Sequence, residues 1–284
     1  MAQEGACSDI VLLEESLPLS DTDQVFYDAI KKEFGPDCNE EFCIRLARAY
    51  RGEKKNRMGK TLGETKKVLE WRKQMQADEL INMNLDKAEL FSQCWPSMLA
   101  GEDYYGHIIN YDRLKDIQLE SFLANFTLDQ VLLHRAKHME RLRAEMTAVS
   151  KRVGRRIYRH ICIFDLSGIG LKHMAPSVIN FLKPIFDLGQ VYYPESLFRM
   201  YLVNAPFVFW GTWKIISNFI DPETKEKIQI FKNAESFLVD AKKHGIPMSA
   251  IPKSLGGECT GRMLDESFVA SISVPVIPAV VVTE

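Results

Sequence analysis

Three residues in the second half of the chain could together hold a phosphate and a sugar. Thr224 and Lys227 lie three residues apart, and Glu195 directly follows Pro194. At the foot of a helix or turn, that spacing puts a hydroxyl and an ammonium on one side, where they can bind phosphate by hydrogen bond and charge. The carboxylate of Glu195 could accept hydrogen bonds from sugar hydroxyls. Spacing alone favours a plain surface ion pair, which contributes about 0–1 kcal/mol.

A second set of candidates lies on a predicted strand at 157–166. His160, Cys162 and Phe164 share one face of it, because side chains alternate along a strand. The first two could indicate haem or metal ligation, or a Cys–His catalytic pair. Side chains at i and i+2 stand side by side, however, which suits neither a shared tetrahedral ion nor a base–nucleophile hydrogen bond. His134 and His138 are one helical turn apart and could form a metal pair, but no third ligand accompanies them.

Two further patterns are interpreted as structural. Gly168 and Gly170 are similar to the start of a dinucleotide-binding fingerprint, but the third glycine is replaced by His173, so we interpret the segment as a strand-to-helix turn. Asp165 is interpreted as a residue that hydrogen-bonds within this turn, because no partner for a catalytic base is evident.

An apolar stretch at 207–220 is predicted to be a helix. Only Lys214, Ser217 and Asn218 interrupt it, and Asp221-Pro222 ends it, because the residue before a proline is pushed out of the α region. A helix that is apolar nearly all round must be buried on several sides or face lipid, and fourteen residues are too few to span a bilayer. The pattern fits an ordinary core helix, or a gate over an apolar cavity that touches membrane when it opens. The side chains of such a gate would be Phe207, Phe209, Trp210, Trp213, Ile216, Phe219 and Ile220.

Alternating helix and strand signals predict an α/β fold with a largely parallel sheet. The expected helices lie at 20–35, 37–52, 61–75, 127–156 and 171–181. The expected strands lie at 107–111, 157–166, 199–203 and 227–230. Residues 1–20 show no period and are expected to be a mobile end, and 80–99 is expected to be a connector.

Composition limits the function classes. The chain has 284 residues, of which 46% are hydrophobic and 26% charged, as in globular proteins. Its 36 basic and 38 acidic residues give a net charge of -2, so nothing global indicates nucleic-acid binding, although a local basic patch could still face anionic lipid. The six cysteines are scattered without a CxxC pair, which suits a reducing compartment and argues against a zinc site.

The ends of the chain predict that any membrane contact is peripheral. The first residues are acidic and lack a basic stretch, so we expect no signal peptide, and Ala2 excludes N-myristoylation. The apolar stretch at 274–282 is short and contains Pro275 and Pro278, so we do not expect it to span a bilayer. We therefore expect a cytoplasmic protein that touches membranes reversibly.

Five short motifs follow one another over roughly a hundred residues. They are FDLSGIG (164–170), YYPE (192–195), LVNAP (202–206), FIDPETKEKIQI (219–230) and IPKSLGG (251–257). In this order and spacing they resemble the Sec14-like, or CRAL-TRIO, lipid-transfer proteins, over 91–262 well and over 37–73 loosely. The resemblance implies an N-terminal helical domain at 21–80 and a CRAL-TRIO lipid-binding domain at 90–262 with an apolar pocket and a gate helix. A mobile N-terminus at 1–20 and a C-terminal extension at 263–284 would flank them.

The resemblance also assigns ligand-binding residues. It implies that Glu195, Thr224 and Lys227 form a phosphatidylinositol headgroup site. The family's arginine at this site falls on Tyr50, so Arg48 or the nearby Arg51 is the expected replacement.

Four positions that bind a choline head group in the family differ in this chain, and they bear on the identity of a second ligand. The family prototype surrounds a choline headgroup with two tyrosines, a serine and a threonine. These positions fall here on Leu99, Asn110, His160 and Cys162, and none matches. We therefore expect His160 and Cys162 to contact a second apolar ligand that is not phosphatidylcholine.

The sequence as a whole predicts a Sec14-like protein that binds and exchanges phosphatidylinositol at membranes. We expect no catalytic residues, no metal, no cofactor besides bound phospholipid and no nucleic-acid partner, while a phosphoinositide kinase could act downstream. The alternatives are a binding module for a retinoid, a tocopherol or haem, an interaction scaffold with a vestigial pocket, and an enzyme. The last lacks an evident nucleophile–base–acid set.

Overall fold

The computed structural model of the protein describes residues 13–268 and 270. Its helices are α1 (Asp21–Phe34), α2 (Glu40–Arg48), α3 (Arg57–Gln74), α4 (Ala88–Cys94), α5 (Leu119–Asn125), α6 (Leu128–Val153), α7 (Pro176–Asp187), α8 (Phe209–Ile216), α9 (Pro222–Glu226) and α10 (Ala234–Lys243). Its strands are β1 (Ser97–Glu102), β2 (Ile108–Arg113), β3 (His160–Asp165), β4 (Leu197–Val203), β5 (Ile228–Ile230) and β6 (Arg262–Met263).

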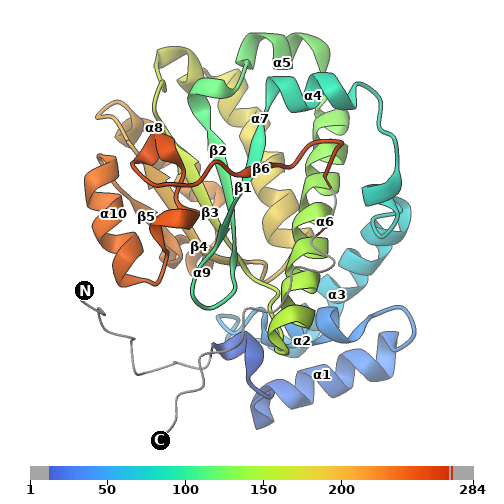
Figure 1. Cartoon of the computed structure of the whole chain (residues 1–284). Coiled ribbons are helices and arrows are strands. Elements are labelled where there is room, and N and C mark those ends of the chain that lie inside the picture. The colour runs from blue at the N-terminus through green and yellow to red at the C-terminus, as the bar shows by residue number, and fades with distance from the viewer. Residues whose placement is uncertain (1–12, 269, 271–284) are drawn as a thin grey trace, which may run out of the picture.

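The six strands form one sheet in the order β5-β4-β3-β2-β1-β6. Strands β2 to β5 run parallel, whereas β1 is antiparallel to both of its neighbours. In Figure 1, α10 lies on one side of the sheet and α6 and α7 on the other. The predicted α/β fold, with a helical N-terminal region and a mixed sheet, is confirmed.

The two faces of the sheet differ because side chains alternate along each strand. On one face, Ile161, Ile163 and Tyr201 pack with Phe237 and Ala241 of α10 into a closed core. The other face carries two cross-strand rows, Asn110–Cys162–Met200 and Asp112–Phe164–Leu202. These rows line a cavity instead of a filled core.

Capping residues set the helix ends. Thr127 opens α6 with a capping box, and Gly154, at φ 65°, ends it in the left-handed conformation that favours glycine. The expected start of the third helix at 61 is wrong, because the Asn56 side chain already accepts a hydrogen bond from the Gly59 N–H and starts α3 at 57. The second helix stops at 48 instead of 52, because the backbone turns at Tyr50, whose φ is 61°.

The expected connector at 80–99 is also wrong, because it contains α4 and the start of β1. The sequence of β1 does not indicate a strand, because Ala100 and Gly101 have low β propensity. The strand is also irregular, with a register shift between Leu99 and Gly101. The next strand begins at 108 and runs to Arg113, two residues past its expected end.

Residues 13–20 contact the rest of the molecule, so the expectation of a mobile end does not hold for them. Glu15 is 1% exposed, and its Oε1 lies 2.9 Å from Nε2 of His107, whose Nδ1 lies 2.8 Å from Asp103. These contacts are polar, so no apolar periodicity in the sequence indicates that the segment packs against the rest of the molecule. The first residues and the apolar stretch at 274–282 lie outside the described residues.

The first three helices share an apolar cluster of their own, which includes Ile30, Phe42 and Leu46. Arg45 joins this cluster to the α/β part, because its Nε donates to the Pro194 carbonyl over 2.9 Å. The domain boundaries at 20, 80, 90 and 262 stay predictions. In the part of the chain that the structure describes, no helix has the length and apolar character needed to cross a bilayer.

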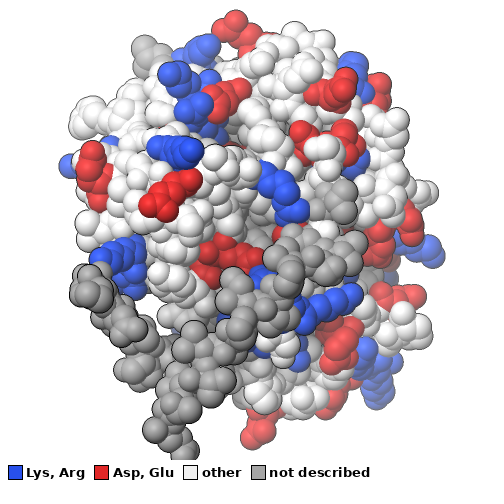
Figure 2. Space-filling view, in the orientation of Figure 1, with Lys and Arg blue, Asp and Glu red and all other residues white. Residues whose placement is uncertain are grey.

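Charged side chains are spread over the surface. On the face shown in Figure 2, those of Lys and Arg are interspersed with those of Asp and Glu among the described residues. This mixed pattern agrees with the net charge of -2 and differs from the continuous basic face typical of nucleic-acid binding.

Candidate functional site

One face of the sheet, together with α6, α7 and α8, surrounds a cavity of about 1060 Å³. Pockets that hold drug-sized ligands measure roughly 300–1,000 Å³, so this one has room for a large ligand. Much of its wall is apolar, and the apolar lining includes Ile117, Phe122, Leu166, Ile169, Phe181, Leu182, Ile185, Phe186, Met200 and Leu202. The cavity can therefore shelter long apolar groups from water.

The predicted gate segment forms one wall of this cavity. The expected single helix at 207–220 is shorter, because α8 ends at Ile216 and a 3-10 turn at Ser217–Phe219 follows. The side chains that face the cavity are those of Phe209, Trp213, Ile216, Phe219 and Ile220. Two of the predicted gate residues do not line it.

These two residues lie on the outer side of the gate segment. Phe207 is 93% exposed and Trp210 is 37% exposed, and the neighbouring Ile215 is 48% exposed. The segment is thus apolar on both sides, toward the cavity and toward solvent. Large apolar side chains exposed to solvent are typical of surfaces that contact another apolar body.

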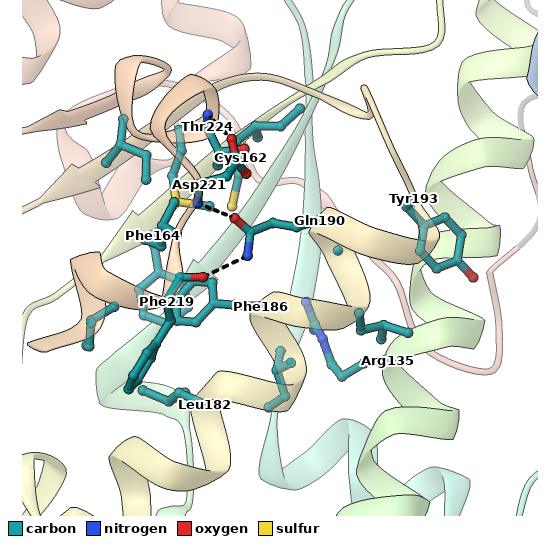
Figure 3. A pocket seen from close by; sticks show the side chains of 18 of the residues that line it. Arg135, Cys162, Phe164, Leu182, Phe186, Gln190, Tyr193, Phe219, Asp221 and Thr224 are labelled. Carbon is teal, nitrogen blue, oxygen red and sulfur yellow. Dashed lines mark hydrogen bonds between the residues drawn. The ribbon is translucent and has the colours of Figure 1, made fainter. Parts of the chain in front are cut away.

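The side chain of Gln190 forms two hydrogen bonds to the end of the gate segment (Figure 3). Its Nε2 donates to the carbonyl of Phe219 over 3.0 Å, and its Oε1 accepts from the N–H of Asp221 over 2.8 Å. Gln190 lies in a π-helical turn, Leu188–Tyr192, directly after α7. One amide side chain therefore ties the gate to the helix beside it, and the sequence offered no signal for this role.

Glu195, Thr224 and Lys227 all line one end of the cavity, so the structure brings the predicted headgroup set together. The Lys227 Nζ lies 3.7 Å from Glu195 Oε2, which also pairs with Arg159. Glu195 has φ 55°, a backbone conformation uncommon for a non-glycine residue. Asp221 caps α9, because its side chain accepts from the Thr224 N–H over 2.8 Å. The short α9 thus fixes Thr224 and Lys227 beside the carboxylate.

The expected replacement of the family arginine is not found at this end of the cavity. Arg48 is 2% exposed, and it donates to the Tyr158 hydroxyl and the Leu17 carbonyl. Arg51 pairs with Glu14 and Asp23 near the chain start, and neither arginine lines the cavity.

Tyr50 itself does line the cavity, and its buried hydroxyl has no hydrogen-bond partner among the described residues. Burial, and to a smaller extent the carboxylates of Glu64 and Glu195, raise the pKa of Tyr50, so its hydroxyl stays neutral. Lys60 lies over the Tyr50 ring, with its Nζ 5.4 Å from the ring centroid, and it also lines the cavity. Lys60 therefore places a cation beside the position of the expected arginine.

His160 and Cys162 face the cavity from β3, as their shared strand face predicts. Burial lowers the pKa of His160 to about 4 and raises that of Cys162 to about 12, so both are neutral at pH 7. Asn110 is beside Cys162 in the next strand and also lines the cavity. Leu99 does not, because it packs with Ile108 under α6.

His134 and Asp165 have structural partners. His134 Nε2 bonds to the Asp86 carbonyl over 2.9 Å, and among the described residues no group of three His, Cys, Asp or Glu is placed to hold a metal. The interpretation of Asp165 as a turn residue is confirmed, because its Oδ1 accepts from the Ser167 N–H and from the Asn204 amide.

Arg135 is not among the sequence candidates although a weak signal exists, and His138 is considered only as a metal pair with His134. Both residues line the cavity from α6. Arg135 lies between Leu132 and Met139, which are one turn of the helix away on either side and apolar. A cation beside the apolar face of an amphipathic helix is a recognisable signal of a buried polar role.

Comparisons with known proteins agree with this geometry. A family model described as CRAL/TRIO domain matches residues 92–257. The chain is 30% identical to the Sec14 cytosolic factor of Schizosaccharomyces pombe over 196 residues, which are 68% of this chain and 67% of the relative.

It is also 30% identical over 204 residues to a phosphatidylinositol/phosphatidylcholine transfer protein, SFH14, of Arabidopsis thaliana. That match covers 70% of this chain but only 35% of the plant protein. The crystal structure of Sfh5 has a similar fold, with a TM-score of 0.61 at 18% identity over 78% of this chain and 84% of that one.

Proposed function

The chain belongs to the Sec14-like CRAL/TRIO family, and from that premise we propose that it is a lipid-transfer protein that binds phosphatidylinositol and exchanges it at membranes. The observation that supports the proposal best is that one cavity combines apolar walls with a charged, hydroxyl-bearing region formed by Glu195, Thr224 and Lys227. A phospholipid has matching parts, namely apolar acyl chains and an anionic head group.

The head group binds at the end formed by Glu195, Thr224 and Lys227. The ammonium of Lys227 and the hydroxyl of Thr224 hold the phosphate by charge and hydrogen bond. Glu195 accepts hydrogen bonds from inositol hydroxyls, and its pairing with Arg159 fixes the direction of its carboxylate. The acyl chains lie along the apolar wall. No bond is made or broken in this process.

The gate couples exchange to the membrane. Phe209, Ile216 and Ile220 are 4%, 8% and 4% exposed, and opening the gate would expose all three. At about 1.5–3 kcal/mol each, opening in water costs about 5–9 kcal/mol. Against a bilayer the cost falls, because lipid tails replace the lost contacts. Exchange is thus confined to moments when the outer side of the gate touches lipid.

Membrane contact in this proposal is peripheral and reversible, and the exposed Phe207, Trp210 and Ile215 support it. A large apolar residue that is 93% exposed has no role in folding that the structure shows, but it can enter the head-group region of a bilayer. Presentation of the lipid to a phosphoinositide kinase stays a prediction.

The test is a vesicle transfer assay with labelled phosphatidylinositol and the double variant Lys227→Ala, Glu195→Gln. Each lost charge-assisted contact is worth about 1.5–3 kcal/mol, so we expect a loss of affinity of at least about tenfold. The matched control is Lys225→Ala, Glu226→Ala, which changes the same residue types in α9 outside the cavity lining. Normal transfer by the first variant would refute the head-group assignment.

A further inference from the structure

A second polar cluster lies in the cavity wall, on other elements than the head-group set. It consists of Arg135 and His138 on α6, His160 on β3 and Asn110 on β2, and we call it the inner cluster. His138, His160 and Asn110 are 4%, 6% and 2% exposed. Arg135 lines the same cavity (Figure 3).

The members of the inner cluster line one cavity from three elements. Arg135 and His138 are three residues apart on α6, and Asn110 is paired with Cys162, two residues from His160 on β3. The positive charge of Arg135 contributes to lowering the pKa of both His138 and His160, after the larger effect of burial.

The inner cluster lacks partners for its polar atoms. Nε2 of His138, Nδ1 of His160 and Oδ1 of Asn110 are buried, and none has a hydrogen-bond partner among the described residues. The same is true of Nε1 of Trp95, which also lines the cavity. Buried polar atoms in native proteins are nearly always satisfied, so several orphans around one space indicate a polar ligand group there.

Arg135 determines the charge of that group. Its guanidinium lies over the Trp95 ring, 4.7 Å from the centroid, and no carboxylate of the described residues lies within 4.0 Å of it. Asp112, an acidic group of the wall in the same strand as Asn110, is engaged by the Ser97 hydroxyl and by the Asn110 amide at 3.2 Å. A partly buried guanidinium without a counter-charge attracts an anion and repels a quaternary ammonium.

The two histidines complete the site as hydrogen-bond donors. Burial holds the pKa of His138 well below its usual range and that of His160 at about 4, so both imidazoles are neutral at pH 7. A neutral imidazole carries one N–H, and the tautomer that turns it toward the cavity can donate to an oxyanion. Together with Arg135 and the Trp95 N–H, the cluster offers several donors to one small group.

We propose that the inner cluster, with Arg135 at its centre, binds the oxyanion head of a second amphipathic ligand, a carboxylate or a phosphate carried on an acyl tail. The proposal rests on the proposed function, because it takes the cavity to be a lipid site. It names the chemistry of the second ligand, which lies with its head buried at the sheet, whereas phosphatidylinositol keeps its head at Lys227.

The test compares charged and uncharged forms of one probe on the purified full chain. The carboxylate probe is cis-parinaric acid and its neutral match is the methyl ester. The phosphate arm compares a fluorescent phosphatidate with the phosphatidylcholine of the same chains. We expect the chain to prefer the anion by about tenfold or more in at least one arm, and the arm that shows it identifies the source.

Arg135→Gln should remove the preference for the anion and leave binding of the methyl ester unchanged. The control Arg152→Gln changes a residue of α6 that pairs with Glu102 outside the cavity lining, and it should keep the preference. Because Arg135→Gln also removes a partly buried charge, we expect its Tm without ligand to equal or exceed that of the parent. This separates lost binding from lost folding.

Equal affinity for anion and ester in the parent chain, or a preference that survives Arg135→Gln, overturns the proposal. A haem absorbance band in the purified protein would do the same, because the histidines would then serve iron. Phosphatidylinositol transfer is measured on the same preparations. Transfer of phosphatidylinositol without a preference for the anionic probe refutes the proposal for the inner cluster alone. A preference for the anionic probe without transfer of phosphatidylinositol refutes the head-group proposal alone.

Discussion

Phe207 tests whether the outer side of the gate segment enters a bilayer. Its side chain is 93% exposed, so Phe207→Ala removes almost no contact within the protein and should change the free energy of unfolding by no more than about 0.5 kcal/mol. Transferring a phenylalanine side chain from water to an apolar phase is worth about 1.5–3 kcal/mol. If the ring enters the membrane, the variant should lose that amount of membrane affinity.

The expected loss corresponds to a factor of about 10 to 150 in the membrane partition constant. The assay is co-sedimentation with vesicles that contain phosphatidylinositol, followed by transfer of the labelled lipid between vesicles. The transfer rate should fall with the partition constant, because opening the gate depends on contact with the membrane. Binding of lipid to the protein, once loaded, should not change.

Tyr104→Ala is the matched control. Tyr104 is an aromatic residue with 74% exposure, in the turn between β1 and β2. That turn lies at the end of the parallel strands opposite to the one from which the gate segment leaves β4. The control should partition like the parent. Unchanged partition of Phe207→Ala, or an equal loss in Tyr104→Ala, would refute the placement of the gate at the membrane.

Three further results are expected. Gln190→Ala removes both hydrogen bonds that hold the end of the gate, so hydrogen exchange at 209–221 should accelerate by a factor that corresponds to about 1–3 kcal/mol. Lys60→Ala should weaken phosphatidylinositol binding, whereas Arg48→Ala should lower the free energy of unfolding by about 1–3 kcal/mol and leave the affinity of the folded protein unchanged. Burial opposes protonation of His107, but hydrogen bonds to Asp103 and Glu15 outweigh it and raise the pKa. Its stabilising contribution is therefore complete below pH 6.5 and is lost as the pH rises through the raised value, and denaturation of His107→Gln against the parent across that range should show the difference shrinking.

That Glu195, Thr224 and Lys227 lie together at the cavity could be predicted because they belong to short motifs. Thr224 and Lys227 belong to one stretch of α9 and its end, and Asp221-Pro222 marks where that helix starts. Glu195 is recognisable from the motif around it, although its φ of 55° is not. The resemblance of these motifs to a family, and not their spacing alone, therefore predicted this grouping.

The inner cluster could not be predicted in the same way. Arg135 lines the same cavity as His160 only because of how α6 packs relative to β3, and nothing in their spacing of 25 residues predicts that placement. Tyr50 gives a similar lesson, since the turn there directs Arg48 to Tyr158 and places Lys60 over the tyrosine ring. A side chain that is missing at one position can be replaced by a side chain from another helix or strand, and only the packing of the elements shows which residue replaces it.

Because side chains alternate along β3, the same strand contributes to the apolar core on one face and to the cavity on the other. Ile161 and Ile163 fill the face that packs on α10, while His160 and Cys162 reach the cavity, so one register places both sets. A shift of one residue would bury the imidazole in the closed core and put isoleucine opposite Arg135. The closed apolar core on the α10 side makes that shift unfavourable. The packing of the core on the α10 side therefore fixes the register of β3, and this register keeps the hydrogen-bond donors of β3 on the cavity side, which Arg135 also lines.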